Sequence, residues 1–177
     1  MAGRDLPDVD DRLRRRVLWS MPTGLYVIGS RDGRERNLMT ANLVVQVATD
    51  PKLVAVAVDA GAVTCRLVAS GACFSVSLLS REDRAVVRRF VKPVPAGEVR
   101  TDEEGRAVEM AGEAVAEHVT GAPVLRSAAA WLDCEVRHRV ELGSHELFVG
   151  EVVGVGGPEG DMPPVLRMED TRMSYGG

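Results

Sequence analysis

The chain has 177 residues, of which 45% are hydrophobic and 4% aromatic, and this length favours a single domain that buries its own core. With so few aromatic side chains, we expect that core to consist mainly of valine, leucine and alanine. The net charge of −4 and the dispersed basic residues argue against nucleic acid as a partner, and no apolar stretch approaches the roughly 20 residues needed to cross a membrane.

The start of the chain is polar and lacks the apolar segment of a secretory signal. We expect residues 1–10 to form a flexible tail and residues 11–177 to form the one domain. Asp8 is placed to cap a helix over residues 12–19, which Pro22 ends.

The cysteines and histidines lack the spacing of metal ligands, so we expect no metal site. An odd number of cysteines without a signal peptide indicates a reducing cytoplasm. The residues concerned are Cys65, Cys73, Cys134, His118, His138 and His145.

Alternating or apolar runs predict the first strands at residues 25–30, 36–47 and 53–58. Asp32-Gly33 is a strong turn signal between the first two. The third run, Leu53 to Val58, is apolar on both faces, which is typical of a central buried strand.

The middle of the chain reads as a helix, a strand and a second helix. Thr64 is placed to cap a short helix that Gly71 ends, and residues 74–79 form a strand. Ser80 and Asp83 have capping-box spacing at the start of a helix that runs to about Phe90.

Residues 92–122 are rich in proline, glycine and acidic side chains. We expect a long surface excursion there, with a helical turn near residues 113–117. Beyond it, residues 131–140 alternate cleanly, which puts His138 on the apolar face and Asp133 on the polar one.

The last third predicts a hairpin at Gly143-Ser144, a paired strand over residues 147–155 and a short strand within 165–175. About six strands with short helices and hairpin connections indicate a closed or nearly closed β-barrel. A doubly wound sheet would need long helices between the strands. The glycines of residues 154–160 are no dinucleotide fingerprint, because Pro158 forbids the helix that must follow.

Two segments allow more than one interpretation. Thr64 is either a plain cap or part of an anion site at a helix start, where Gly61 lets the backbone approach a phosphate. The segment 39–42 either presents Thr and Asn side chains to a planar heterocycle or is an irregular edge strand. His145 follows a turn and can reach the mouth of a cleft, although a plain surface role fits it as well.

The ordered set of these segments resembles the flavin reductase family of FMN-binding split barrels, from about residue 11 to 175. The resemblance rests on Pro22-Thr23-Gly24-Leu25, Leu38-Met39-Thr40-Ala41-Asn42, Asp50-Pro51-Lys52-Leu53, Phe74-Ser75-Val76-Ser77, Gly121-Ala122-Pro123, Trp131-Leu132-Asp133-Cys134 and Ser144-His145 to Val152.

The resemblance implies a mainly β fold, a split β-barrel with short flanking helices that binds FMN or FAD, as a homodimer. It implies hydride transfer from NADH or NADPH to flavin, and the supply of reduced flavin to a separate flavin-dependent monooxygenase. It places a set of residues at the flavin and His145 near the nicotinamide. The flavin residues are Asn37, Leu38, Met39, Thr40, Ala41 and Asn42 at the ring, Asp59, Ala60, Gly61, Ala62 and Thr64 at the ribityl and phosphate groups, and Phe90 closing the site.

The chain departs from the family pattern at two places. Gly61 and Ala62 stand where relatives carry serine in the phosphate loop, and Ser77 stands where they often carry asparagine. These changes leave two other functions open: an electron carrier with tightly held FMN, and a split barrel adapted to a deazaflavin or haem.

Overall fold

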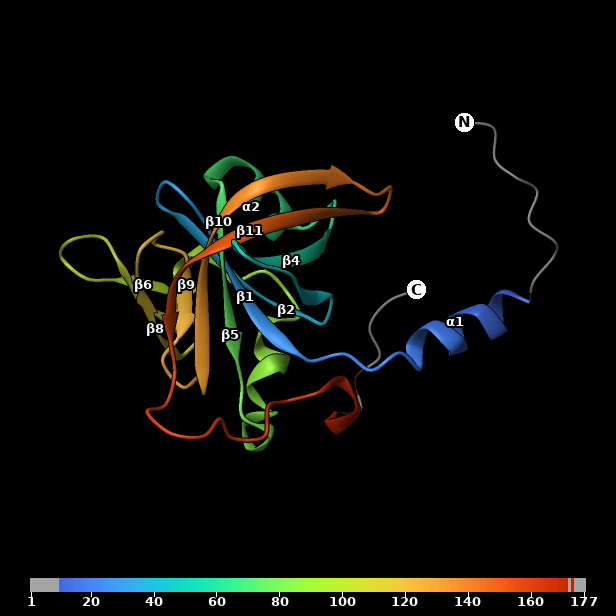
Figure 1. Cartoon of the computed structure of the whole chain (residues 1–177). Helices are drawn as coiled ribbons and strands as arrows, with labels where there is room; N and C mark the ends of the chain where they lie inside the picture. Colours follow the sequence, from blue (N-terminus) through green and yellow to red (C-terminus); the bar gives the residue numbers. More distant parts are fainter. Residues whose placement is uncertain (1–9, 172, 174–177) are drawn as a thin grey trace.

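The computed structural model describes residues 10–171 and residue 173. It contains two antiparallel sheets and short helices (Figure 1). The helices are α1 (Asp11–Trp19), α2 (Val63–Gly71), η1 (Arg81–Asp83), η2 (Val86–Phe90), η3 (Ala96–Glu98) and η4 (Met168–Asp170). The strands are β1 (Tyr26–Asp32), β2 (Glu35–Ala41), β3 (Val44–Thr49), β4 (Lys52–Asp59), β5 (Cys73–Leu78), β6 (Val99–Thr101), β7 (Ala107–Met110), β8 (Glu113–Glu117), β9 (Pro123–Leu125), β10 (Ala130–Glu141) and β11 (His145–Gly156).

The larger sheet has the order β2-β1-β5-β10-β11-β4-β3. Its two edge strands, β2 and β3, follow one another in the chain and are separated only by Asn42 and Leu43. The sheet must therefore curl until its edges meet, which makes a split barrel and confirms the predicted fold class. The predicted single strand over residues 36–47 was wrong because the chain crosses from one edge to the other at Asn42.

The predicted strand over residues 53–58 is confirmed as an interior strand, β4, although it lies second from the edge. Val54, Ala55, Val56 and Val58 are buried there.

The excursion predicted for residues 92–122 contains three short strands, which form a second sheet of order β6-β7-β8-β9 with the strand that follows it. The predicted helical turn at Glu113–Glu117 is strand β8, which pairs with β7 and β9. These strands are three to five residues long and carry acidic and small side chains, so neither their length nor their pattern signals a strand.

Helix α2 is present where a helix was predicted, but its ends differ from the expectation. Ala62, not Thr64, is the N-cap, and the C-cap is Ala72 in the left-handed conformation (φ 52). Gly71 is the last helical residue, and a Cβ there would lie 1.7 Å from the Arg31 carbonyl oxygen. Its role is therefore to let α2 lie directly on β1.

The helix predicted from Ser80 to Phe90 is two short 3-10 helices. The Ser80 side chain caps the first of them, accepting from the Glu82 N–H at 3.3 Å, so Asp83 forms no capping box with it. Val87 and Phe90 are buried, because this segment lies against the barrel wall.

Strand β10 does not alternate as predicted. Register shifts at Asp133/Cys134 and Val136/His138 interrupt its pairing with β11 and change which face the side chains occupy. Asp133, predicted to face the polar side, is fully buried and accepts hydrogen bonds from the Thr120 N–H and hydroxyl. His138, predicted on the apolar face, is exposed.

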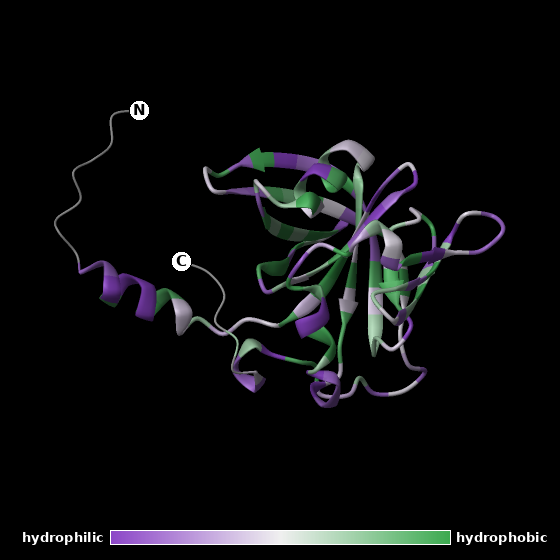
Figure 2. Cartoon of the chain, turned by 180° about the vertical axis from the view of Figure 1, so that it is seen from behind, coloured by the Kyte–Doolittle hydropathy of each residue, from purple (hydrophilic) through white to green (hydrophobic). Residues whose placement is uncertain are grey.

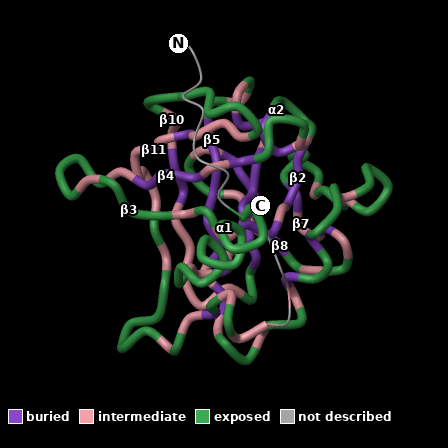
Figure 3. The backbone as a smooth tube through the Cα atoms, turned by 90° about the vertical axis from the view of Figure 1, so that its right-hand side faces the viewer, coloured by how far each residue is buried: buried purple, intermediate pink, exposed green. Residues whose placement is uncertain are grey.

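The buried side chains form two clusters, and Figure 3 shows that the buried stretches of backbone run through the strands in the middle of the molecule. Along β1, Val27 belongs to one buried cluster and Ile28 to the other. The chain has three phenylalanines, and all are fully buried: Phe74, Phe90 and Phe148. Burying each of these side chains stabilises the fold by about 1.5–3 kcal/mol.

The two ends of the described chain lie outside the barrel. Helix α1 begins with Asp10 as its N-cap and has no buried residue, and Figure 2 shows it projecting from the body. The predicted cap Asp8 lies outside the described residues. Within the predicted strand at 165–175, Val165 and Arg167 form single bridges and Met168–Asp170 is a 3-10 turn, while residues 172, 174 and 175 are outside the described part.

None of the helices described is long and apolar enough to span a membrane.

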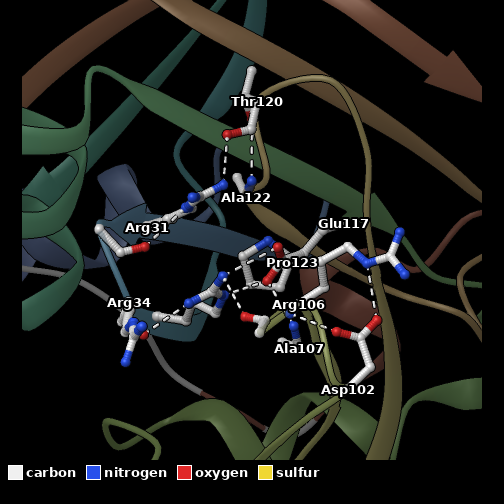
Figure 4. A network of polar contacts seen from close by, with 12 residues as sticks. Arg31, Arg34, Asp102, Arg106, Ala107, Glu117, Thr120, Ala122 and Pro123 are labelled. Atoms are coloured by element: carbon white, nitrogen blue, oxygen red, sulfur yellow. Dashed lines mark hydrogen bonds and ion pairs between the residues drawn. The ribbon is translucent and has the colours of Figure 1, made fainter.

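A buried ion pair joins the two sheets. Arg36 on β2 pairs with Glu117 on β8, and both side chains are only 4% exposed. Arg36 also donates to the carbonyls of Arg34 and Gly105, while Glu117 accepts from the Ala107 N–H at 2.9 Å, in the network of Figure 4. Every charged atom of the pair thus has a partner, which is the condition for tolerating charge in a core.

We expect Glu117→Gln to lower the free energy of unfolding by about 3–5 kcal/mol, because it leaves the Arg36 charge buried and unpaired. Urea denaturation measures this change. Glu35→Gln is the matched control, because the Glu35–Arg66 pair is more than half exposed on both sides and should contribute at most about 1 kcal/mol. Equal losses of unfolding free energy in the two variants would contradict the stabilising role of the buried Arg36–Glu117 pair.

Candidate functional site

The predicted ring-binding segment, Asn37 to Asn42, occupies all but the first two residues of β2 and the residue after the strand. Leu38 is fully buried in the core. Asn37, Thr40 and Ala41 are also buried, at 2%, 4% and 6% exposure. Only Met39 and Asn42 are partly exposed. The segment therefore meets a ligand through few side chains, and most of its polar groups turn inward.

Asn37 bridges two other parts of the chain. Its Nδ2 donates to the Thr64 Oγ1 at 2.9 Å, and its Oδ1 accepts from the Val94 N–H at 2.8 Å. Thr64 lies in the first turn of α2 and is fully buried, so its hydroxyl serves Asn37 and not the helix cap. The amide thereby fixes the start of α2 against β2.

Thr40 makes the corresponding contact to η2. Its hydroxyl donates to the Val87 carbonyl at 2.6 Å. Phe90, three residues on, is fully buried beneath the same segment. Phe90 therefore supports the site through packing, and in this structure its ring does not reach the surface.

The loop before α2 has the features of an anion site. The Asp59 side chain accepts from the Gly61 N–H at 2.8 Å, which folds the loop back on itself. Helix α2 has no side-chain cap and no acidic residue in its first turn. The N–H groups of such a first turn have no partner within the helix and favour a phosphate. The residues present thus fit the phosphate of a flavin, through backbone amides and without the missing serine hydroxyl.

His145 lies beside this loop. It is the first residue of β11 and stands directly opposite Asp59 on β4. The Ser144 carbonyl accepts from the Ala60 N–H at 3.0 Å, and the Ser144 hydroxyl lies 3.0 Å from the His145 Nδ1. The hairpin turn and the loop before α2 are therefore held together.

The structure also contains a second charged pair, at the His145 hairpin, that the sequence did not predict. Arg139 donates to Glu146 at 2.5 and 2.9 Å and lowers the pKa of that carboxyl. Burial, followed by the charge and hydrogen bond of Glu146, raises the pKa of the Cys65 thiol in α2. This contact links the base of the His145 hairpin to the first turn of α2, and only the pairing of distant strands brings it about.

Ser77, the other departure from the family pattern, is fully buried on β5. Its hydroxyl accepts from the Leu125 N–H at 3.1 Å. The shorter side chain thus anchors strand β9 of the second sheet.

None of the three cysteines is poised as a nucleophile. Burial raises the pKa of Cys73, and burial followed by the charge of Asp133 raises that of Cys134 to about 12. All three are free and buried. The described residues also contain no group of three or more His, Cys, Asp or Glu side chains that could hold a metal ion.

The predicted residues thus divide into two groups. The partly or fully exposed ones are Met39, Asn42, Asp59, Ala60, Gly61, Ala62 and His145. The buried ones, which position the others, are Asn37, Leu38, Thr40, Ala41, Thr64 and Phe90. Direct contact of any of them with flavin or nicotinamide stays a prediction.

Comparison with known proteins agrees with this geometry. The profile of the flavin reductase like domain matches residues 18–176. The chain is 29% identical to the NADH-dependent flavin reductase StyB of Pseudomonas fluorescens, over 90% of this chain and 86% of that protein. It is 32% identical to an NADH-dependent FAD reductase of Streptomyces globisporus, over 84% and 78%. The structure of the styrene monooxygenase flavin reductase from Pseudomonas putida S12 superposes with a TM-score of 0.70 at 27% identity, over 90% and 94%.

We expect Thr64→Val to lower the free energy of unfolding by about 1–3 kcal/mol, because it leaves the buried Asn37 Nδ2 without an acceptor. Flavin affinity, measured by fluorescence titration, should fall as well, since the start of α2 loses its anchor. Thr101→Val, at an exposed position of β6, is the control and should change stability by less than about 0.5 kcal/mol. If Thr64→Val changed neither the stability nor the flavin affinity, Thr64 would have no anchoring role.

Proposed function

Because this chain belongs to the flavin reductase family, we propose that it is an NADH-dependent flavin reductase that transfers hydride from NADH to FMN or FAD. The observation that carries the proposal is the uncapped first turn of α2 lying beside His145 and tied through Asn37 to the ring segment of β2. A phosphate site, a ring wall and a histidine at the open edge are thus held in one arrangement.

The residues of the chain divide the work of binding and orientation. Flavin itself supplies the hydride acceptor, while the protein contributes position and electrostatics. The amides of α2 hold the phosphate, and Thr40 keeps η2 against the ring segment. His145 stands at the rim, where it orients the nicotinamide. No side-chain base is required for hydride transfer.

Partners follow from the same proposal. The relatives include the reductase of a styrene monooxygenase, which supports supply of reduced flavin to a separate monooxygenase. A homodimer is supported by the edge strand β3, where Val45 and Val47 are 60% and 51% exposed. Val45 also lines an apolar hollow of about 460 Å³ that reaches Val155 on β11. Light scattering of the purified protein measures this oligomeric state.

The free thiols support a reducing, cytoplasmic setting.

The direct test is NADH and NADPH oxidation by the purified protein, with and without added FMN or FAD. We expect rapid NADH oxidation that saturates with flavin. No oxidation with either flavin would contradict the proposal. Tightly retained FMN in that case would indicate an electron carrier, and a different bound chromophore would indicate a deazaflavin or haem protein.

His145→Ala should slow turnover or raise the KM for NADH while leaving the Kd for flavin unchanged, because the ring lies at the rim and not in the phosphate loop. Steady-state kinetics and flavin titration measure the two effects. His138→Ala is the control, since this exposed histidine lies on the same hairpin. Unchanged turnover and unchanged KM in the His145 variant would remove it from the reaction.

A further inference from the structure

A hollow of about 440 Å³ lies where the second sheet meets the barrel. Its walls come from β8, β9, the start of β10 and the segment after β11. None of the residues that line it belongs to the set predicted for flavin or nicotinamide. We propose that this hollow binds a small aromatic carboxylate, as a ligand site separate from the flavin reaction.

One wall of the hollow is a stacked pair of aromatic rings. The imidazole of His118 and the indole of Trp131 lie nearly parallel, with ring centroids 3.9 Å apart and an interplanar angle of 9°. Gly156 stands opposite Trp131 on β11, and a Cβ there would lie 2.4 Å from the indole Nε1, so the glycine lets the indole lie directly on the strand. The pair is therefore a preformed aromatic wall, against which a ligand ring can pack without first ordering the side chains.

Arg126 supplies a positive charge to the same hollow. Its Nε donates to the Val115 carbonyl at 2.9 Å, which fixes the guanidinium beside Ala116 of the lining. Within residues 10–171 and 173, its two terminal amino groups form no ion pair or further hydrogen bond. A guanidinium presents pairs of N–H groups that match the two oxygens of a carboxylate, so Arg126 is ready to bind an anion.

The rest of the lining favours an anion with a flat apolar body. Among the described residues that line the hollow, none is an aspartate or glutamate that would compete for Arg126. Glu117, the acidic neighbour of His118, is engaged in the buried pair with Arg36. The three alanines at 128–130 contribute only methyl groups, which leaves room for a ring.

The size of the hollow favours a ligand with a single ring. Pockets for drug-sized ligands measure about 300–1,000 Å³, and this hollow lies near the lower end of that range. An aromatic carboxylate combines a ring for the wall of His118 and Trp131 with an anion for Arg126. A phosphate would also suit the arginine, so the test includes nucleotides as competitors.

The fluorescence of Trp131 measures binding directly. The chain has two tryptophans, so Trp19→Phe leaves Trp131 as the only one. In this variant we expect benzoate to change the emission until it saturates. Cyclohexanecarboxylate lacks the aromatic ring and benzyl alcohol lacks the charge, so each should bind at least about tenfold more weakly. A signal that does not saturate by about 10 mM benzoate would contradict the inference.

Substitutions in the same background test the two recognition elements. Arg126→Gln should raise the Kd for benzoate about tenfold or more, because a charge-assisted contact is lost. Arg100→Gln is the matched control, since this arginine lies on β6 of the same sheet in an exposed pair with Glu109. His118→Ala should weaken binding several-fold, whereas His138→Ala, at an exposed histidine of β10, should not. Thermal denaturation checks that each variant is folded.

Other results would overturn the inference. An unchanged Kd for benzoate in folded Arg126→Gln would show that the arginine does not hold the carboxylate. Equal affinities for benzoate and cyclohexanecarboxylate would show that the aromatic wall does not select the ligand. Displacement of benzoate by AMP, NADH or FAD would assign the hollow to a nucleotide. Absence of NADH oxidation in the unmodified chain would contradict the proposed function and leave benzoate binding unaffected.

Discussion

The amide of Asn37 is buried and satisfied from two sides, by the Thr64 hydroxyl and by the Val94 N–H. A buried amide that lost either partner would carry the full cost of its desolvation, so the three segments cannot separate without destabilising the fold. Its neighbours on β2 act alike: Arg36 fixes the second sheet and Thr40 fixes η2. One edge strand thus sets the position of α2, η2 and the second sheet, while the His145 hairpin is held by its own pairing with the loop before α2.

The residues that position the proposed site are different from those that a ligand could touch. The positioning residues are buried, whereas the loop at Asp59 to Gly61 and the ring of His145 are accessible. A rigid β2 keeps the ring wall in place, and the loop folded by the Asp59–Gly61 hydrogen bond offers its amides to a phosphate. An open site of this kind suits a flavin that enters, accepts hydride and leaves.

About half of the described basic residues form ion pairs with carboxylates. The chain carries 22 basic residues, of which only Lys52 and Lys92 are lysines. Most of the ion pairs in the described chain are exposed and contribute little to stability. Arg84 and Arg88 lie on one wall of a hollow whose other wall carries Glu169 and Asp170.

The sequence by itself determined four of the barrel strands, the helix at Thr64, the loop before it and the hairpin turn that precedes His145. Apolar alternation and turn residues are local signals, and β1, β4, β5 and β11 carry them. Only the tertiary structure decided that residues 99–125 form a sheet, because its strands are three to five residues long and gain stability from pairing and not from their own pattern. It likewise decided that Asn37 and Phe90 support the site from within, since burial depends on which distant segments cover a side chain.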